Sequence, residues 1–223
     1  MEPQLNLLEE AKILVVGDII LDRYWMGESK RISPEAPVPV VHGKKVLNRL
    51  GGAGNVAANV ASLGCSVSLL GYVGQDEEGD LVRKLLKECQ IESGLISRED
   101  LNTTVKIRVI SQGQQLVRVD FEDSPNKFKS DHLTKAFQEI VDDYHLVIFS
   151  DYLKGALHDV SQLIALANER HKRVIADPKG SDFSRYKGAY LVTPNMKEFE
   201  TVVGVCPDEQ AISSKAKKLA KDN

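Results

Sequence analysis

Two aspartates follow an apolar run near the start of the chain, where carboxylates can act on a ligand. The run Ile13–Val16 is followed by Gly17 and Asp18, and Asp22 comes four residues later. Ligands of open α/β sheets bind beyond the carboxyl ends of the strands, and carboxylates accept hydrogen bonds from hydroxyl groups. We therefore expect Asp18 to bind a polyhydroxylated small molecule rather than to serve only as a turn acid. For Asp22, substrate binding and a solvated surface role stand equally open.

A glycine-rich turn, Gly51-Gly52-Ala53-Gly54-Asn55, opens a helix of small residues. Glycine lets a ligand approach the backbone closely, and amides at a helix start favour anions or hydroxyl oxygens. No Gly-Lys-Ser/Thr follows, and the glycine spacing differs from the dinucleotide fingerprint, so the turn is neither of those nucleotide loops. Alone it is a weak signal for a substrate site. Asn55 either bonds a sugar hydroxyl or caps the helix.

An Asn-x-x-Glu unit, Asn195 to Glu198, directly follows a predicted strand. Residues three apart share a helix face. Amide and carboxylate oxygens suit a hydrated Mg²⁺ that phosphates also hold. The simpler interpretation of this unit taken alone is a helix N-terminus with a stabilising acid.

Several basic side chains are candidates for binding phosphate. Lys154 and Lys179 lie in loops after predicted strands, as does Asp151, and such loops hold the sites of α/β folds. Arg108 and Arg118 lie in a predicted hairpin, and arginine matches phosphate oxygens bidentately. The lysines can equally be solvated, and the arginines can equally form surface ion pairs.

The elements that must position these residues alternate between strands and helices. Such alternation predicts βαβ units and a mostly parallel sheet flanked by helices. Strands are predicted at 13–16, 67–72, 146–150, 173–177 and 191–194, and helices at 55–63, 76–89, 131–142, 160–172, 197–203 and 208–221. The extended segments at about 32–46 and 103–121 do not fit this rhythm. We expect them to form a separate small β lid, with a hairpin turn at 112–114.

Composition excludes several classes of protein. The 223 residues carry a net charge of −3, which gives no nucleic-acid footprint. Three widely spaced cysteines argue against a zinc site and a disulfide framework, and suit a reducing cytosol. No apolar run approaches a membrane span, and the acidic first ten residues do not resemble a signal peptide. We expect a cytoplasmic protein with neither nucleic-acid nor membrane partners.

Together these residues resemble the ribokinase-like (PfkB) carbohydrate kinases. The shared pattern is Gly17-Asp18, Gly51-Gly52 with Asn55, Gly-x-x-Gly-x-Asp-x-x-Gly over 71–79, and Asn195-x-x-Glu198. Segments 21–25, 31–40, 114–122 and 177–183 resemble more narrowly the D-glycero-D-manno-heptose 7-phosphate kinases, and Ser-Pro-Glu-Ala-Pro-Val-Pro at 33–39 is especially specific. In many bacteria that kinase is the N-terminal half of bifunctional ADP-heptose synthase. The resemblance extends over essentially the whole chain.

The resemblance implies a ribokinase-like α/β fold and a reaction. ATP, with Mg²⁺, phosphorylates the anomeric hydroxyl of a heptose 7-phosphate to the 1,7-bisphosphate, on the path to ADP-heptose and the lipopolysaccharide core. The expected substrate-binding residues are Asp18, Asp22, Gly51, Gly52, Asn55, Arg108, Arg118 and Asp151. Those expected beside the nucleotide are Lys179, Asn195, Met196, Lys197 and Glu198, with Asn195 and Glu198 holding Mg²⁺ through water.

One family signature is missing. The Asp-Thr-x-Gly-Ala-Gly-Asp motif, which carries the catalytic base, is absent from residues 1–223. We expect the chain to be a truncated kinase domain that belongs to a longer protein and is inactive alone. The alternatives are another PfkB sugar or nucleoside kinase, or a non-catalytic sugar-phosphate-binding module. Apolar residues in the lid predict a homodimer formed lid to lid, because a two-stranded sheet is marginal by itself.

Overall fold

A parallel sheet forms the centre of the computed structural model, which describes residues 10–128 and 131–222. The acidic N-terminal segment discussed above therefore lies almost entirely outside the described residues. The sheet has six strands in the order β10-β9-β8-β1-β4-β5, and every neighbouring pair is parallel. Its strands are β1 (Lys12–Gly17), β4 (Ser66–Gly74), β5 (Glu92–Arg98), β8 (Leu146–Ser150), β9 (Arg173–Asp177) and β10 (Leu191–Val192).

Helices cover both faces of this sheet, which explains why its inner strands read as continuous apolar runs. Leu14 and Val16 of β1 pack in the core with α3 and α4, whereas Ile13 and Val15 pack with α1 and α2. The helices are α1 (Ala53–Ser62), α2 (Glu77–Glu88), α3 (His132–Ile140), α4 (Val160–Glu169), α5 (Met196–Val203) and α6 (Glu209–Asp222). Short 3-10 turns are η2 (Pro125–Phe128), η3 (Val141–Asp143) and η4 (Phe183–Tyr186). None of the described helices is long and apolar enough to span a membrane.

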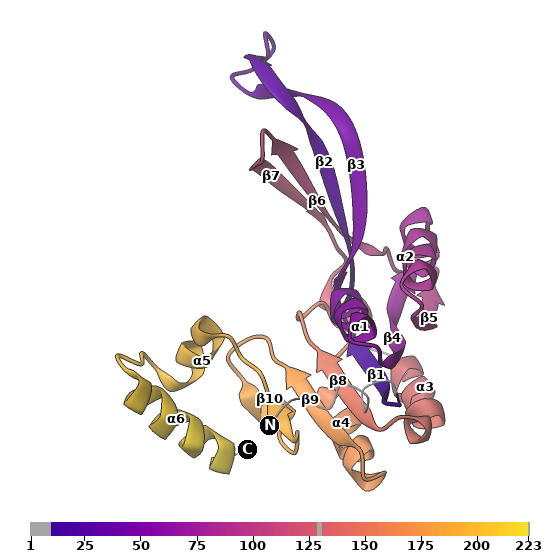
Figure 1. The fold of residues 1–223 in the computed structure, drawn as a ribbon, viewed down its shortest axis with the longest axis vertical. Helices are drawn as coiled ribbons and strands as arrows, with labels where there is room; N and C mark the ends of the chain where they lie inside the picture. Colours follow the sequence, from indigo (N-terminus) through magenta and orange to yellow (C-terminus); the bar gives the residue numbers. More distant parts are fainter. Residues whose placement is uncertain (1–9, 129–130, 223) are drawn as a thin grey trace.

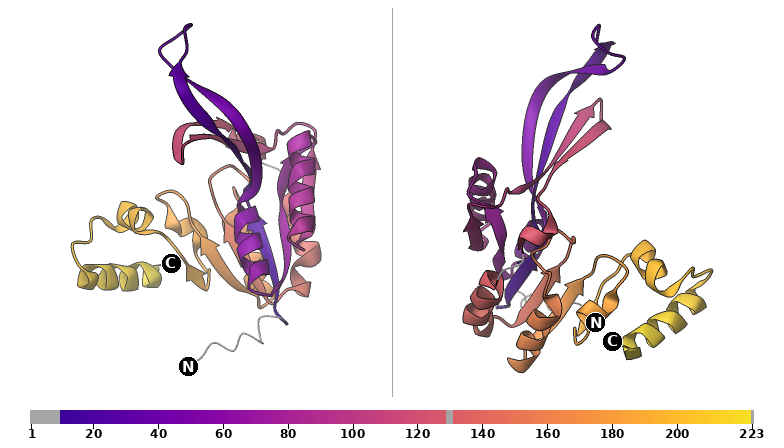
Figure 2. Two further views of the ribbon diagram at one scale, coloured as in Figure 1. Left: turned by 45° about the horizontal axis from the view of Figure 1, so that its top comes forward. Right: turned by 180° about the vertical axis from the view of Figure 1, so that it is seen from behind.

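A second sheet, the lid, stands away from the central sheet (Figure 1 and Figure 2). It has four strands in the order β3-β2-β6-β7. They are β2 (Ile19–Ile32), β3 (Pro39–Gly52), β6 (Thr104–Ser111) and β7 (Gln114–Phe121). The hairpin of β6 and β7 confirms the prediction for 103–121.

The other two strands of the lid, β2 and β3, extend well beyond the predicted segment 32–46. The expected extended segment 32–46 is in fact the outer part of a long hairpin, in which β2 begins directly after Asp18 and residues 33–38 form the turn. Much of β2 is only half-buried or exposed, so its sequence lacks the apolar alternation that marks a strand. Strand β5 was missed for the same reason, because most of its residues are exposed or half-buried.

The base of the lid is tied to the central domain by Asp76. Its carboxylate caps α2 by accepting a hydrogen bond from the Gly79 amide at 2.7 Å. It also accepts from the Thr103 amide at 2.8 Å and the Thr103 hydroxyl at 2.6 Å, just before β6 begins. One side chain therefore joins the end of β4, the start of α2 and the entry to the lid.

The end of β1 approaches β8 so closely that only glycine fits. A Cβ added to Gly17 would lie 2.1 Å from the Ser150 carbonyl oxygen. We predict that Gly17→Ala lowers the free energy of unfolding by about 1–3 kcal/mol, because the strands must separate to admit the methyl group. Gly43→Ala in the lid is the control, since a Cβ there meets nothing within 4 Å.

Urea denaturation followed by circular dichroism measures both variants. The control should stay within about 0.5 kcal/mol of the wild type. Equal stabilities for the two variants would contradict the close packing of β1 on β8.

Candidate active site

A cleft of about 640 Å³ lies between the lid and the loops after β8 and β9. This volume is in the range of small-molecule sites. The lid contributes Asp22, Tyr24, Arg49, Lys106, Arg108 and Arg118; the glycine turn contributes Gly51, Gly52 and Asn55; and the loops contribute Tyr152, Lys154 and Lys179. The cleft thus brings together eight of the candidate residues named from sequence: Asp22, Gly51, Gly52, Asn55, Arg108, Arg118, Lys154 and Lys179.

Asn55 lies in the cleft but does not cap the helix. Helix α1 begins at Ala53, two residues earlier than expected, and its N-cap is Gly52, so Asn55 is an exposed residue within the first turn. Gly52 has φ of 55°, and a Cβ there would lie 2.3 Å from the Asp18 carbonyl oxygen. Glycine at position 52 is therefore required by local geometry, and Gly51 and Gly52 both line the cleft.

Positive charge dominates the cleft. Its basic side chains outnumber its acids, and most of them are held by ion pairs with carboxylates. Arg108 bonds Asp22 at 2.6 Å, and Lys106 and Arg118 share Asp120 at 3.0 and 2.9 Å. These pairs hold the basic side chains over the cleft in fixed positions.

Two lysines complete the charged lining from the loop side. Lys154 bonds Glu122 at 2.6 Å, and Lys179 bonds Glu198 at 2.6 Å. Lys106 and Arg49 were missed from sequence. Lys106 lies two residues before Arg108 on the same strand face, so strand alternation could have found it.

Asp18 does not line the cleft, and its expected role in substrate binding stays a prediction. Its side chain is 2% exposed and adjoins a void of only about 10 Å³, which holds one water at most. Its carboxylate instead accepts hydrogen bonds from the amides of Tyr152 (2.7 Å), Lys154 (3.1 Å) and Ala156 (3.0 Å). Asp18 therefore shapes the loop whose side chains line the cleft.

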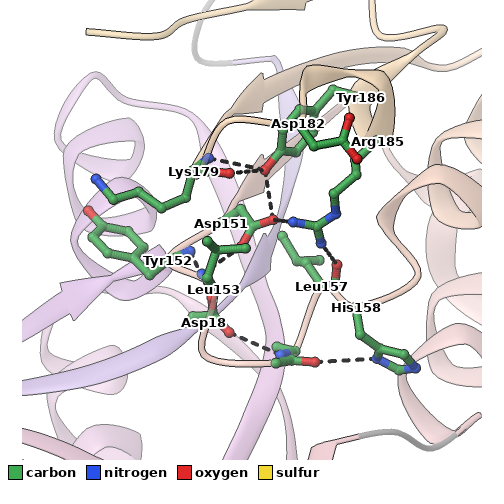
Figure 3. Close-up of polar contacts among 12 residues, drawn as sticks. Asp18, Asp151, Tyr152, Leu153, Leu157, His158, Lys179, Asp182, Arg185 and Tyr186 are labelled. Atoms are coloured by element: carbon green, nitrogen blue, oxygen red, sulfur yellow. Dashed lines mark hydrogen bonds and ion pairs between the residues drawn. The ribbon is translucent and has the colours of Figure 1, made fainter. Parts of the chain in front are cut away.

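Asp151 is also buried, at 3% exposure, and does not line the cleft either. It accepts hydrogen bonds from the Leu153 amide (2.8 Å) and the Tyr186 hydroxyl (2.8 Å), and pairs with Arg185 at 3.3 Å. Figure 3 shows this network, with the Tyr152 and Lys179 side chains extending from it toward the same side. Both buried aspartates thus hold the backbone of the loop after β8, whose side chains Tyr152 and Lys154 line the cleft.

The charge on Asp18 is costly in this position. Burial and the nearby charge of Asp151 raise its pKa to about 6, although the hydrogen bonds from the three backbone amides lower it. The same loop holds Leu153 at φ of 54°, a conformation that side chains rarely adopt. The hydrogen bonds to the two carboxylates offset this strain.

The Asn195–Glu198 unit begins helix α5, as the simpler interpretation of its sequence predicts. The Asn195 side chain accepts from the Glu198 amide at 3.0 Å, and Glu198 accepts from the Asn195 amide at 3.1 Å, which is a capping box. Lys179 and the Asn195 amide lower the pKa of Glu198 against the opposing effect of burial. Burial, with the charge of Glu198, raises the pKa of Asp177.

The other residues expected beside the nucleotide lie apart from the cleft. Lys197 is exposed, and Met196 lines an apolar groove of about 480 Å³ between β10, α5 and α6. Among the described residues, no cluster of three or more His, Cys, Asp and Glu side chains could hold a metal ion.

Comparison with known proteins decides the family. The sequence pattern of the pfkB family of carbohydrate kinases matches residues 10–222. The chain belongs to this family. It is 48% identical over 222 residues to the bifunctional protein HldE of Shewanella amazonensis, covering 100% of this chain and 47% of that protein. HldE of Haemophilus influenzae PittEE is 48% identical over 214 residues, covering 96% and 45%. The chain spans about half the length of the curated relatives it matches.

Solved structures of pfkB-type kinases have the same fold. Ribokinase from Giardia lamblia superposes with a TM-score of 0.73 at 17% identity, covering 95% of this chain and 70% of that chain. Phosphofructokinase-2 from Escherichia coli gives 0.72 at 21% identity, covering 95% and 70%. These confirm the predicted ribokinase-like architecture of a mostly parallel sheet flanked by helices with a β lid.

The buried carboxylate of Asp18 predicts a specific pH dependence of stability. Its pKa rises from 3.8 in the unfolded chain to about 6 in the fold, so the folded state binds more protons between these values. The Asp18 contribution to the free energy of unfolding should therefore increase as the pH falls from 7 toward 4 and be lost as the pH rises through 6. Relative to Asp18→Asn, the wild type should gain about 2 kcal/mol between pH 7 and pH 4.5.

Urea denaturation at several pH values measures this difference. Asp143→Asn, which makes the same change at an exposed carboxylate, is the control. A difference between wild type and Asp18→Asn that stays constant with pH would contradict the raised pKa of Asp18.

Proposed function

We propose that this chain carries the sugar-phosphate site of a D-glycero-D-manno-heptose 7-phosphate kinase, which transfers phosphate from ATP to the anomeric hydroxyl. The observation that carries the proposal is the basic cleft under the lid, in which one carboxylate and one amide lie among six cationic side chains. Hydroxyl-binding groups set among phosphate-binding groups suit a phosphorylated sugar. The HldE relatives, similar over the whole chain, support the heptose substrate and a place in ADP-heptose and lipopolysaccharide core synthesis.

Each wall of the cleft has a distinct task in this proposal. Asp22 and Asn55 bond sugar hydroxyls, and Gly51 and Gly52 let the sugar approach the backbone. The lid cations bind the phosphate of the substrate. Phosphoryl transfer depends mainly on positioning and charge stabilisation, and these residues hold the sugar in one orientation.

Lys179 links the cleft to the proposed nucleotide side. Its amine bonds Glu198 of the capping box while its side chain also lines the cleft. We place the ATP phosphates beside Lys179, Asn195 and Glu198. Mg²⁺ prefers oxygen ligands and keeps several waters when phosphates bind it, so Asn195 and Glu198 fit it through water alone. When bound, Mg²⁺ neutralises phosphate charge. Because the proposed reaction consumes ATP, we also propose a cytoplasmic location for the enzyme.

Asp22→Asn tests the substrate assignment. The amide keeps the size of the side chain but exchanges an acceptor oxygen for a donor and removes the charge. We predict that affinity for D-glycero-D-manno-heptose 7-phosphate falls roughly tenfold or more, since hydrogen bonds to charged groups contribute about 1.5–3 kcal/mol.

Isothermal titration calorimetry measures binding, with Asp143→Asn as the control outside the cleft. Wild type that binds fructose 6-phosphate or a nucleoside more tightly than the heptose phosphate would refute the substrate. Unchanged affinity in Asp22→Asn would refute the role of Asp22.

A homodimer through the lid is the second part of the proposal. The lid face opposite the cleft exposes large apolar side chains, namely Trp25, Val46, Val117, Val119 and Phe121. Strand alternation places them there, because Asp22 and Tyr24 line the cleft whereas Arg23 lines the pocket behind the lid. A contiguous exposed apolar patch of this kind marks an interaction site.

Trp25 and Met26 offer a matched test of this interface. They are neighbours on β2 with 44% and 37% exposure, and alternation directs them to opposite faces. We predict that Trp25→Lys converts a dimer to a monomer, because a charge would be buried in an apolar interface, and that Met26→Lys leaves the dimer intact. Sedimentation velocity at micromolar concentration measures both. A monomeric wild type, or equal behaviour of the variants, would contradict the interface.

A further inference from the structure

The cleft-facing side of the lid carries an uncompensated positive charge. Arg49 on β3, Lys106 and Arg108 on β6 and Arg118 on β7 provide four cationic side chains. Only two carboxylates, Asp22 and Asp120, bond to this group. The lid face therefore has two positive charges in excess, which matches the charge of one phosphate dianion.

Strand register brings like charges together on this face. Arg108 and Arg118 are direct cross-strand partners on β6 and β7, and like charges in that relation repel. Arg49 lies directly opposite Asp22 on β3, yet the Asp22 carboxylate bonds Arg108 instead, at 2.6 Å. Arg49 is therefore the cross-strand neighbour of Asp22 but not its ion-pair partner.

Arg49 is held in place without an acid partner. Within residues 10–128 and 131–222 it makes no ion pair with a carboxylate. Its guanidinium packs over the Tyr24 ring at 5.7 Å from the centroid, and the Arg108 guanidinium packs over the same ring at 5.3 Å. The Tyr24 ring on β2 therefore packs against two guanidinium groups, one from each of the neighbouring strands β3 and β6.

We infer that Arg49 and Arg108, held by the Tyr24 ring, form the binding site for the phosphate group of the sugar substrate, and that Arg49 determines specificity for phosphorylated sugars. The guanidinium planes present donors that match phosphate oxygens. Arg108 already shares its charge with Asp22, so Arg49 supplies the unneutralised charge that distinguishes a sugar phosphate from a sugar. The sugar identity rests on the proposed function; the anion site does not.

This site also fixes the direction of the substrate. The phosphate lies on the lid, so the rest of the sugar extends toward the glycine turn and the loops after β8 and β9. Lys154 and Lys179 line that end of the cleft. The hydroxyl farthest from the phosphate is then the one presented beside the proposed nucleotide side.

Arg49→Gln is the test, with Arg31→Gln as its control. Arg31 is an exposed arginine of the same lid and does not line the cleft. Calorimetry would use three probes: inorganic sulfate, a dianion whose charge does not change near neutral pH; heptose 7-phosphate; and the unphosphorylated heptose. Circular dichroism and thermal melting confirm that each variant folds.

We expect Arg49→Gln to bind sulfate and heptose 7-phosphate roughly tenfold to a hundredfold more weakly than wild type, with no change for unphosphorylated heptose. Arg31→Gln should match wild type for all three. Sulfate binding that depends on Arg49, without any binding of heptose 7-phosphate, would refute the proposed substrate but support the anion site. No sulfate binding by wild type, or equal loss for phosphorylated and unphosphorylated sugar in Arg49→Gln, would overturn the inference.

Discussion

The site depends on the hydrogen bonds that the buried Asp18 makes with the residues around it. Its backbone amide donates to the Ser150 carbonyl at 3.2 Å, and its carbonyl accepts from the Ala53 amide at 2.9 Å. Its side chain binds three amides of the loop after β8. One residue therefore fixes the glycine turn and the β8 loop relative to each other, and these are two walls of the cleft. A buried charge is tolerated only with such partners.

The network continues from this loop toward α5. Tyr186 donates to Asp151 at 2.8 Å and accepts from the Lys179 amide at 3.0 Å. Lys179 in turn bonds Glu198, whose side chain is part of the capping box. Asp151 and Tyr186 are buried and bonded to each other, and satisfied buried polar groups favour a single arrangement of side chains. The β8 loop, the β9 loop and the start of α5 are thus held as one unit behind the cleft.

The lid gives its two faces different chemistry by strand alternation alone. One face presents three arginines and Lys106 to the cleft, and the other presents Trp25, Val117 and Phe121 to solvent. A four-stranded sheet can have this division because successive side chains point to opposite faces. The proposed substrate binding and the proposed dimer contact therefore use the same strands without competing for the same residues.

The sequence by itself determined the fold class, the parallel sheet and the β6–β7 hairpin, because apolar runs and alternation are local signals. It also identified most of the cleft residues, since glycines and charged residues at strand ends are visible in one dimension. It did not find β2, whose half-exposed residues carry no clear period. Only the tertiary structure decided that Asp18 is a buried support and Asp22 the carboxylate in the cleft. That choice depends on which side chain meets the amides of residues 152–156, more than 130 positions away. The role proposed for Arg49 likewise depends on the fold, because the lid register places Arg49 opposite Asp22 while the Asp22 carboxylate bonds Arg108.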